Sequence, residues 1–498
     1  MKGGKLATLL MLLIKRITMR ICIVSSIGKQ TYQGKYLEKK GIWSDFWNLA
    51  LFHEGMPIDI VDYYQLISEG RIQINSDRHI YTNGIVLANR LSNDNSVCIW
   101  NSLPDSYDIE NIDVLLISTN YITGNWIFYL KDLLIKCNKL GIKCVIGGIG
   151  IKKLYLNDNL QFQEISNLVD GFIVIADGGL KATKWAVEHI YDRIPDKIII
   201  GENDYDFMHT DYSMKKIDVS LHSQHTVLLT QNGCIYNCAF CSYKDRNGEH
   251  TFFDLDEVKQ ALLEIVRTNK KGIRHIRFAD ETFNLNNHRI IELCNFITEQ
   301  KFEFTWSCFL RANNITKELI DALAKSKCDF VSIGIESGSR KMQKIMNKNI
   351  DLDQLKNSIS LIKEAGIVVN VSLLVGFLGE DDRTIQDTID YIRDCKPTLA
   401  RINLWYPARG ENNKELFQEY GFIVDKDTWR HDTMSEQEAV IAAKKLYLMD
   451  SDTIVIPPFS SIFDQWPVLS SKGLKADKIV NILRSYYTNA KKKYLLEN

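Results

Sequence analysis

The chain has 498 residues, more than a single hydrophobic core organises, so two or three domains are expected. With 45% apolar and 25% charged residues the composition is that of a soluble globular protein, and the net charge of −1 argues against a nucleic-acid surface or a polybasic membrane patch. Eleven cysteines without a regular pairing pattern favour free thiols in the reducing cytoplasm over a disulfide framework.

Residues 1–18 resemble a weak signal peptide, because Lys2 and Lys5 precede the apolar run 6–14. Basic residues follow this run, no small-residue cleavage site is present, and the run is too short to span a bilayer. We hypothesise that Met19 is the native first residue and that residues 1–18 are a misassigned extension. A mass spectrum of native protein that begins at Lys2 would contradict this hypothesis.

Residues 19–205 alternate short apolar runs with amphipathic stretches, a pattern typical of parallel strands and covering helices. Residues 126–140 have apolar side chains at helical spacing, and Gly141 follows at the position where helices often end. A Rossmann-like α/β domain with ligand room at the carboxyl ends of its strands is therefore predicted. The strands are expected at residues 21–25, 58–63, 97–100, 114–118, 144–147 and 172–176.

A polar linker is expected at residues 203–223, and the apolar run 226–230 after it leads into a short loop rich in cysteine. This loop contains Cys234, Cys238 and Cys241 in the pattern C-x3-C-x2-C. Three thiolates suit a four-iron cluster with one iron left open for another ligand. A structural zinc site normally needs a fourth ligand and two close pairs, and no second pair follows nearby. Zinc binding or plain packing of the thiols are the alternatives.

Residues 206–415 repeat a strand followed by a helix six times, which is too few repeats for a closed eight-stranded barrel. The strands are expected at residues 226–230, 273–279, 304–309, 330–335, 368–375 and 399–404. The helices between them are expected at residues 255–268, 287–300, 316–326, 352–365 and 382–394.

Polar residues and glycines follow the predicted strands, at the ends where barrels of this kind carry functional residues. Asp280 and Glu281 follow the second strand, and Arg311 follows the third, where its guanidinium would reach a carboxylate bidentately. The fourth strand ends in the sequence GIESG at residues 334–338, and the fifth in GFLGE at residues 376–380. Strand-end carboxylates also cap following helices, so each fragment has a structural alternative.

The cysteine loop, with Phe240 before its last cysteine, resembles the signature of the radical S-adenosylmethionine (SAM) superfamily. The resemblance implies an open (β/α)6 barrel and a [4Fe-4S] cluster bound by the three cysteines. In that family the free iron chelates SAM, and reduction cleaves SAM to methionine and a 5'-deoxyadenosyl radical. A reductant such as flavodoxin or ferredoxin is the implied protein partner.

The same resemblance implies roles for the strand-end residues. Asp280 and Glu281 stand where the family holds the SAM ammonium group, and Arg311 is a further candidate contact. The segment with Glu336 and Ser337 resembles the GxES element that binds the ribose or methionine part of SAM. Two glycines resemble those of the G-x-P-G-E element on the adenine side, although a leucine replaces its proline; they are Gly376 and Gly379.

The later half of the first domain resembles cobalamin-binding domains that precede many radical SAM barrels. Ser118 at a strand end and the Gly147-Gly148 turn match positions near the tail of the corrin in that family, so cobalamin is the third implied cofactor. A Gly-Gly pair after a strand is also a common tight turn. The lower-ligand pattern D-x-H-x-x-G is incomplete, since Asp77-Arg-His79 lacks its glycine.

Residues 416–498 are expected to form a mostly helical C-terminal region. A helix there is predicted to begin after Ser435, with Glu438 completing a capping box. Residues 429–434 resemble a W-x-H-x-T-M element that follows the barrel in cobalamin-type radical SAM enzymes. His431 within it is a candidate proton donor or substrate contact, with a packed structural histidine as the alternative.

The leading functional hypothesis is a cobalamin-dependent radical SAM methyltransferase acting on an unactivated centre of a natural product or peptide. The first alternative is a cobalamin-independent radical SAM epimerase, cyclase or cross-linking enzyme that keeps the first domain as a scaffold. The second is a non-catalytic iron-sulfur or zinc protein. Electron carriers usually saturate their cluster with protein ligands, and no fourth cysteine lies near this loop.

Overall fold

The computed structural model describes most of the chain and divides it into two compact units. Residues 1–31, 75–223 and 260–272 cluster in unit 1, and residues 32–74, 224–259 and 273–498 in unit 2. The predicted linker at residues 203–223, the Asp77–His79 pattern and the N-terminal extension at residues 1–18 lie outside the described residues. The described residues are 19–27, 49–53, 56–58, 60–69, 87–88, 91, 95–100, 109–119, 125–156, 160–176, 179–201, 224–241, 250–405, 414–425, 428–458 and 462–497.

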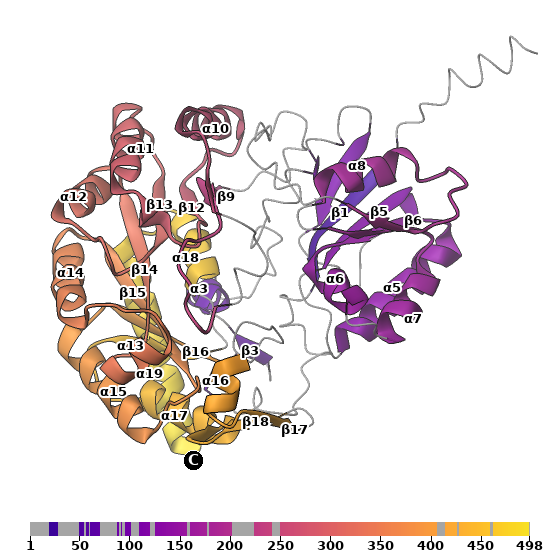
Figure 1. Cartoon of the computed structure of the whole chain (residues 1–498). Coiled ribbons are helices and arrows are strands. Elements are labelled where there is room, and N and C mark those ends of the chain that lie inside the picture. Colours follow the sequence, from indigo (N-terminus) through magenta and orange to yellow (C-terminus); the bar gives the residue numbers. More distant parts are fainter. Residues whose placement is uncertain are drawn as a thin grey trace, which may run out of the picture. The chain divides into compact units, whose positions relative to one another are not determined.

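Unit 1 is built on a parallel sheet that buries both of its faces (Figure 1). Alternate residues of one strand point to opposite faces, so Leu115 and Ile117 join the core cluster under α5 and α7, whereas Val114 and Leu116 join the cluster under α8. The sheet order is β4 (Ser96–Trp100), β1 (Arg20–Ile27), β5 (Val114–Thr119), β6 (Lys143–Gly147), β7 (Gly171–Ile175), β8 (Ile198–Ile200). The helices are α5 (Asn125–Leu140), α6 (Ile149–Leu156), α7 (Leu160–Leu168) and α8 (Leu180–Glu188).

The strand order of unit 1 reverses at β1, which pairs with β4 on one side and with β5 on the other. In open parallel sheets, the loops after the two strands at such a reversal run to opposite faces of the sheet. This leaves a crevice at the carboxyl ends of the two strands. The predicted Rossmann-like α/β class is therefore confirmed, and the end of β5 lies at the place where this class binds ligands.

Unit 2 contains a parallel sheet with helices along its outer side (Figure 1). Within the described residues its strand order is β20 (Ile454–Ile456), β16 (Leu399–Leu404), β15 (Val368–Val375), β14 (Cys328–Glu336), β13 (Thr305–Leu310), β12 (His275–Phe278), β9 (His225–Leu228). In chain order α10 (Leu255–Thr268) lies between β9 and β12, and its residues 260–268 are assigned to unit 1. The other intervening helices are α11 (Asn287–Glu299), α12 (Lys317–Lys325), α13 (Arg340–Ile345), α14 (Leu352–Glu364) and α15 (Asp382–Cys395). Side-chain caps start several of them, such as Thr316 on α12 and Asp351 on α14.

The C-terminal region adds one more strand to this sheet, because β20 pairs in parallel with β16. The sequence analysis missed this strand, which has only three residues and therefore shows no readable periodicity. The predicted capping box at Ser435 and Glu438 is confirmed at the start of α17. The region comprises α16 (Lys414–Glu419), β17 (Ile423–Asp425), β18 (Thr428–His431), β19 (Met434–Ser435), α17 (Glu436–Leu448), α18 (Ile462–Ser471) and α19 (Ala476–Glu497).

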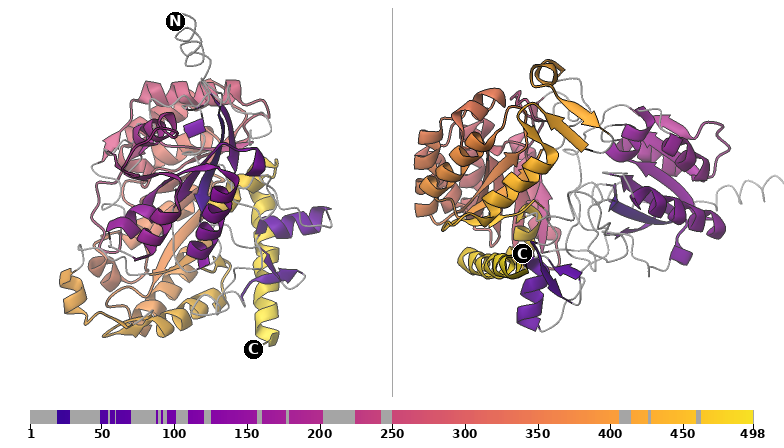
Figure 2. Two further views of the ribbon diagram at one scale, coloured as in Figure 1. Left: turned by 90° about the vertical axis from the view of Figure 1, so that its right-hand side faces the viewer. Right: turned by 90° about the horizontal axis from the view of Figure 1, so that it is seen from below.

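The strand predicted at residues 58–63 is wrong. Only the hairpin of β2 (Leu51–His53) and β3 (Met56–Ile58) is extended, and α3 (Ile60–Glu69) follows it. Val61 and Gln65 are buried one helical turn apart, and Tyr63 packs edge-on against Tyr486 of α19 at 5.5 Å between ring centroids. Figure 2 shows α3 and the hairpin beside α19. The apolar residues from Ile60 onward therefore form a helix in spite of their β-branched side chains, because the helix packs against α19.

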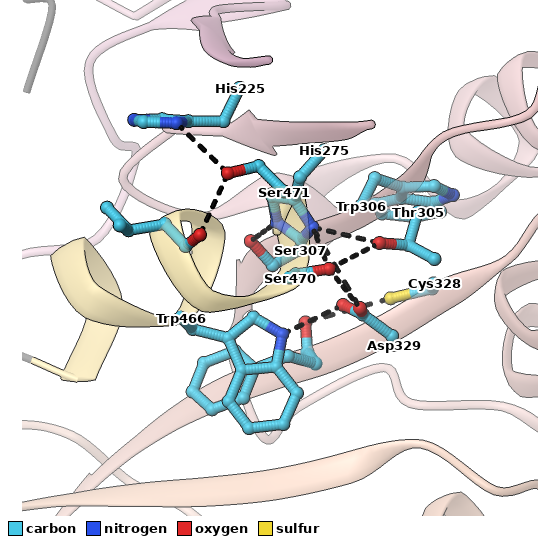
Figure 3. A network of polar contacts seen from close by, with 12 residues as sticks. His225, His275, Thr305, Trp306, Ser307, Cys328, Asp329, Trp466, Ser470 and Ser471 are labelled. Atoms are coloured by element: carbon cyan, nitrogen blue, oxygen red, sulfur yellow. Dashed lines mark hydrogen bonds and ion pairs between the residues drawn. The ribbon is translucent and has the colours of Figure 1, made fainter. Parts of the chain in front are cut away.

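A buried polar network lies at the amino ends of the strands of unit 2 (Figure 3). His275 contacts Ser307 through Nε2 at 3.0 Å and Ser470 of α18 through Nδ1 at 3.1 Å. Asp329 accepts hydrogen bonds from Trp466 Nε1 at 3.0 Å and from Ser470 Oγ at 3.1 Å. Since catalytic groups of such sheets lie at the opposite ends of the strands, this network holds the buried helix α18 in place.

The side chain of Asp329 is 12% exposed, and burial raises its pKa to about 7. A raised carboxyl pKa stabilises the folded state below the unfolded value near 3.9, and this stabilisation is lost as the pH rises through 7. We therefore expect the free energy of unfolding of the wild type, relative to Asp329→Asn, to fall by about 2 to 3 kcal/mol between pH 5 and pH 8. Urea unfolding of both proteins across this range measures the difference. A difference that does not vary with pH would show that Asp329 stays ionised throughout.

None of the described helices combines the length and the apolar character that a bilayer span requires.

Candidate active site

The cysteine loop follows β9 at the carboxyl end of the sheet. Its base is a short antiparallel pair of β10 (Gln231–Asn232) and β11 (Thr251–Phe252). Cys234 and Cys238 are half-buried and Cys241 is exposed, whereas the other cysteines are buried apart from the half-buried Cys98. Three accessible thiols on one loop are the donor set that an iron-sulfur cluster needs.

The far side of this loop is held by the segment that follows α13. The backbone N–H of Ala239 donates to the carbonyl of Met346 at 2.9 Å, and the side chain of Asn347 donates to the carbonyl of Asn237 at 2.8 Å. Asn347 has a φ of +50°, a left-handed conformation that asparagine adopts more readily than most residues. The loop is therefore positioned by the segment after α13 as well as by its own strand.

Within the described residues, no three His, Cys, Asp or Glu side chains form a group that would hold one metal ion. The thiolates that hold a four-iron cluster each bind a different iron, so their sulfurs are not required to converge on a single point.

Asp280 holds the base of the cysteine loop. Its fully buried carboxylate accepts hydrogen bonds from Thr230 N at 2.7 Å, from Thr230 Oγ1 at 2.6 Å and from Gln231 N at 3.3 Å. Burial raises the pKa of Asp280 to about 7, and the hydrogen bonds from Thr230 oppose that rise. The carboxylate thus holds the start of the loop, and its contact with SAM stays a prediction. Glu281, directly after it, is half-buried.

Arg311, at the end of β13, points to the cysteine loop. Its Nη1 donates to Cys238 Sγ at 3.4 Å, and its guanidinium lies 3.6 Å from the ring centre of Tyr236. Its Nη2 donates to the carbonyl of Lys348 at 2.5 Å. The structure therefore brings Arg311 to a predicted cluster ligand, a contact that sequence spacing gave no means of finding.

Glu336 and Lys348 form a buried ion pair beside the same loop. Lys348 Nζ lies 2.7 Å from Glu336 Oε1, with side-chain exposures of 9% and 11%. A Cβ at Gly334 would lie 2.5 Å from that oxygen, so the glycine leaves the space for the pair. Glu336 has a φ of +64°, a strained conformation for a residue other than glycine. Lys348 also lies 5.3 Å from the ring centre of Phe240.

Ser337 is fully buried, and its hydroxyl is used within the fold. Its Oγ lies 3.0 Å from Thr388 Oγ1 on α15 and accepts the backbone N–H of Ser339 at 3.1 Å. A Cβ at Gly338 would clash with Tyr391 and Thr388, so this turn packs tightly on α15. These contacts shape the turn, and the role of Ser337 in binding SAM stays a prediction.

The turn after β15 contains both predicted glycines. Gly376 and Gly379 have φ values of +94° and +80°, and a Cβ on either would clash with side chains of the C-terminal region. Glu380, which the sequence analysis did not single out, accepts the N–H of Gly376 at 2.5 Å. Its burial raises the pKa of this carboxyl to about 8. The sequence GFLGE at residues 376–380 could have indicated this contact, because its two glycines and its glutamate form one turn.

His431 belongs to an aromatic row that reaches the cysteine loop. Its ring stacks on Trp429 at 5.6 Å, and its Nε2 lies 3.4 Å from the carbonyl of Gly376. Trp429 meets Trp405, Trp405 meets Phe377, and Phe377 meets Phe240, each edge to face. Burial lowers the pKa of His431. These contacts fix the ring of His431 in the aromatic row, and its role as a proton donor or substrate contact stays a prediction.

In unit 1 the structure brings Ser118, Gly147 and Gly148 together at the carboxyl ends of neighbouring strands. Ser118 pairs with Gly147, and Gly148 has a φ of +100°. A Cβ at Gly148 would lie 2.5 Å from the carbonyl oxygen of Thr119, so only glycine fits this turn. Thr119, which the sequence analysis missed, donates to the carbonyl of Gly147 at 2.8 Å and accepts the N–H of Ile151 at 3.0 Å.

The family model described as the radical SAM superfamily matches residues 228–392, the part of the chain that runs from the end of β9 to α15. The chain therefore carries a radical SAM domain. Domains of this family bind a [4Fe-4S] cluster and SAM, and these are the cofactors of this domain. The three accessible thiols after β9 are the residues that fit the cluster.

Two curated relatives each match part of the chain. An uncharacterized methyltransferase of Pyrococcus horikoshii is 26% identical over 185 residues, which cover 37% of this chain and 40% of that protein. The anaerobic magnesium-protoporphyrin IX monomethyl ester cyclase of Rubrivivax gelatinosus is 25% identical over 213 residues, or 42% and 38% of the two chains. The chain thus spans about two fifths of the length of these relatives.

Solved structures share the fold of both units. The radical SAM methyltransferase TsrM of Kitasatospora setae, with cobalamin and a [4Fe-4S] cluster bound, aligns at a TM-score of 0.55 and 14% identity over 82% of this chain and 96% of TsrM. The cobalamin-dependent radical SAM enzyme OxsB aligns at a TM-score of 0.51 and 15% identity over 85% of this chain and 58% of OxsB. The fold of this chain is therefore similar to the fold of these two proteins, as the sequence predicted.

Proposed function

We propose that this protein is a radical SAM enzyme whose cluster is held by Cys234, Cys238 and Cys241. The observation that carries the proposal is their position: three accessible thiols lie on one loop at the carboxyl end of β9, inside the matched domain. When bound, the cluster supplies one electron to SAM and thereby generates the 5'-deoxyadenosyl radical. The electron comes from a low-potential protein such as flavodoxin or ferredoxin.

The chain itself contributes position and shielding. Asp280 fixes the base of the loop through Thr230 and Gln231. We therefore assign the neighbouring Glu281 to the SAM ammonium group. We assign Glu336, held by Lys348, to the ribose or methionine part of SAM. The aromatic row from Phe240 to His431 packs beside the loop and keeps water away from that side.

We further propose that the enzyme is a cobalamin-dependent methyltransferase acting on an unactivated centre of a natural product or peptide. The support is the fold of unit 1, the reversal of its strand order beside β5, and the likeness to TsrM and OxsB. Ser118, Gly147 and Gly148 are the residues that would hold the corrin tail. They lie at the carboxyl ends of β5 and β6, and the absence of a side chain at both glycines lets a ligand approach the backbone there. Cobalamin, when bound, supplies methyl transfer to carbon.

Anaerobic reconstitution tests both levels of this proposal. Protein supplied with iron, sulfide and cobalamin, then reduced with dithionite in the presence of SAM, is expected to form 5'-deoxyadenosine and to carry the visible absorption of a corrin. Absence of 5'-deoxyadenosine from protein with an intact cluster would point to a non-catalytic iron-sulfur protein.

A cobalamin-independent radical SAM enzyme is the second candidate, favoured by the match to a relative named as a cyclase. Such an enzyme would carry out epimerisation, cyclisation or cross-linking of a small molecule or peptide. Formation of 5'-deoxyadenosine by protein that retains no corrin after cobalamin feeding would support this candidate over the methyltransferase.

A further inference from the structure

The guanidinium of Arg311 is held in one orientation by four groups. Besides its contacts with Cys238 Sγ, Tyr236 and the carbonyl of Lys348, its Nε donates to Asn313 Oδ1 at 3.1 Å. Arg311 is 8% exposed, so these contacts are little weakened by water. The charge therefore stays beside the sulfur of Cys238.

The backbone of Arg311 is held equally firmly. Asn284, in the turn after β12, accepts the N–H of Arg311 through Oδ1 at 2.8 Å and donates through Nδ2 to its carbonyl at 2.9 Å. Asn284 is 2% exposed. Both the main chain and the side chain of Arg311 are thus fixed before any cofactor binds, which is the arrangement expected of a residue that acts on a bound group.

We propose that Arg311 sets the reduction potential of the cluster by donating a hydrogen bond to the Cys238 thiolate, and so acts as a positioning residue. One electron from a low-potential reductant converts the oxidised [4Fe-4S]2+ cluster to [4Fe-4S]+, and no bond to the protein breaks. The reduced cluster places more negative charge on its sulfurs, so a cationic donor stabilises it more than the oxidised form. This inference rests on the proposed cluster site and adds a residue that acts on it.

The test is a redox titration of the reconstituted full-length protein, followed by electron paramagnetic resonance of the reduced cluster. Removing a charged hydrogen bond in Arg311→Gln is expected to lower the equilibrium constant of reduction about tenfold, which equals about 59 mV for one electron. Arg289→Gln is the matched control, because this half-buried arginine donates to the carbonyls of Thr230 and Phe253 at the same end of the sheet. The control is expected to keep the wild-type potential.

Each outcome has one meaning. A wild-type potential in Arg311→Gln overturns the inference, while wild-type protein that holds no [4Fe-4S] cluster overturns the proposed function instead. If Arg311→Gln does not retain a cluster, Arg311→Lys is titrated, since lysine keeps the charge and loses the planar fork. A potential below the wild-type value in Arg311→Lys supports the inference, and an unchanged one contradicts it.

Discussion

Replacing Cys234, Cys238 or Cys241 with alanine is expected to abolish the cluster absorption and to reduce 5'-deoxyadenosine formation to the level of a protein-free control. Each thiolate binds a separate iron, so the loss of one thiolate leaves the cluster attached to the protein through only two irons. The folded chain should survive, because all three side chains are partly or fully exposed and none contributes to the buried core. Iron and sulfide analysis together with chromatography of the nucleoside product measures the effect.

The control for these variants is Cys98→Ala, which removes a half-buried thiol from β4 in unit 1. This variant is expected to keep its iron content and product yield. If one of the three loop variants retains the cluster and the activity of the wild type, that cysteine is not a ligand and the assignment of the loop is wrong.

Lys348→Met is expected to destabilise unit 2 by about 3 to 5 kcal/mol, because it leaves the Glu336 carboxylate buried without its cation. The variant Glu336→Gln together with Lys348→Met removes both charges and is expected to recover most of this loss. Urea unfolding of the single variants and the double variant gives the coupling energy. Equal destabilisation by Lys348→Met in the presence and absence of Glu336 would show that the pair is not coupled.

The matched control for this pair is Arg340→Met, which removes a salt bridge to Asp353 at 2.6 Å between two exposed side chains. Exposed pairs of this kind contribute about 0 to 1 kcal/mol, so a small effect is expected. The contrast separates the cost of an unpaired buried charge from the loss of any ion pair.

The sequence was sufficient to predict the features that depend on local pattern. Short apolar runs predicted the strands of both sheets except β8 and β20, and the spacing of Cys234, Cys238 and Cys241 predicted their common loop. Local propensity failed at residues 58–63, where packing against α19 stabilises a helix. It also failed at β20, where three residues gain their partner only from β16.

The contacts of the site residues were less predictable, because their partners come from distant parts of the chain. Arg311 meets Cys238 across 73 residues, and Asp280 meets Thr230 across 50. The sequence predicted neither contact with the loop, and the assignment of both residues to SAM stays a prediction. Thr119 gave no signal because threonine at a strand end is common, and only its bonds to Gly147 and Ile151 distinguish it.

The electron paramagnetic resonance spectrum of the reconstituted, dithionite-reduced protein, recorded with and without SAM, tests the central claim most directly. Three cysteine ligands and one open iron predict a [4Fe-4S]+ signal whose g values change when SAM binds that iron. A [4Fe-4S]+ signal that is the same with and without SAM, or protein that forms no such cluster, would contradict the account.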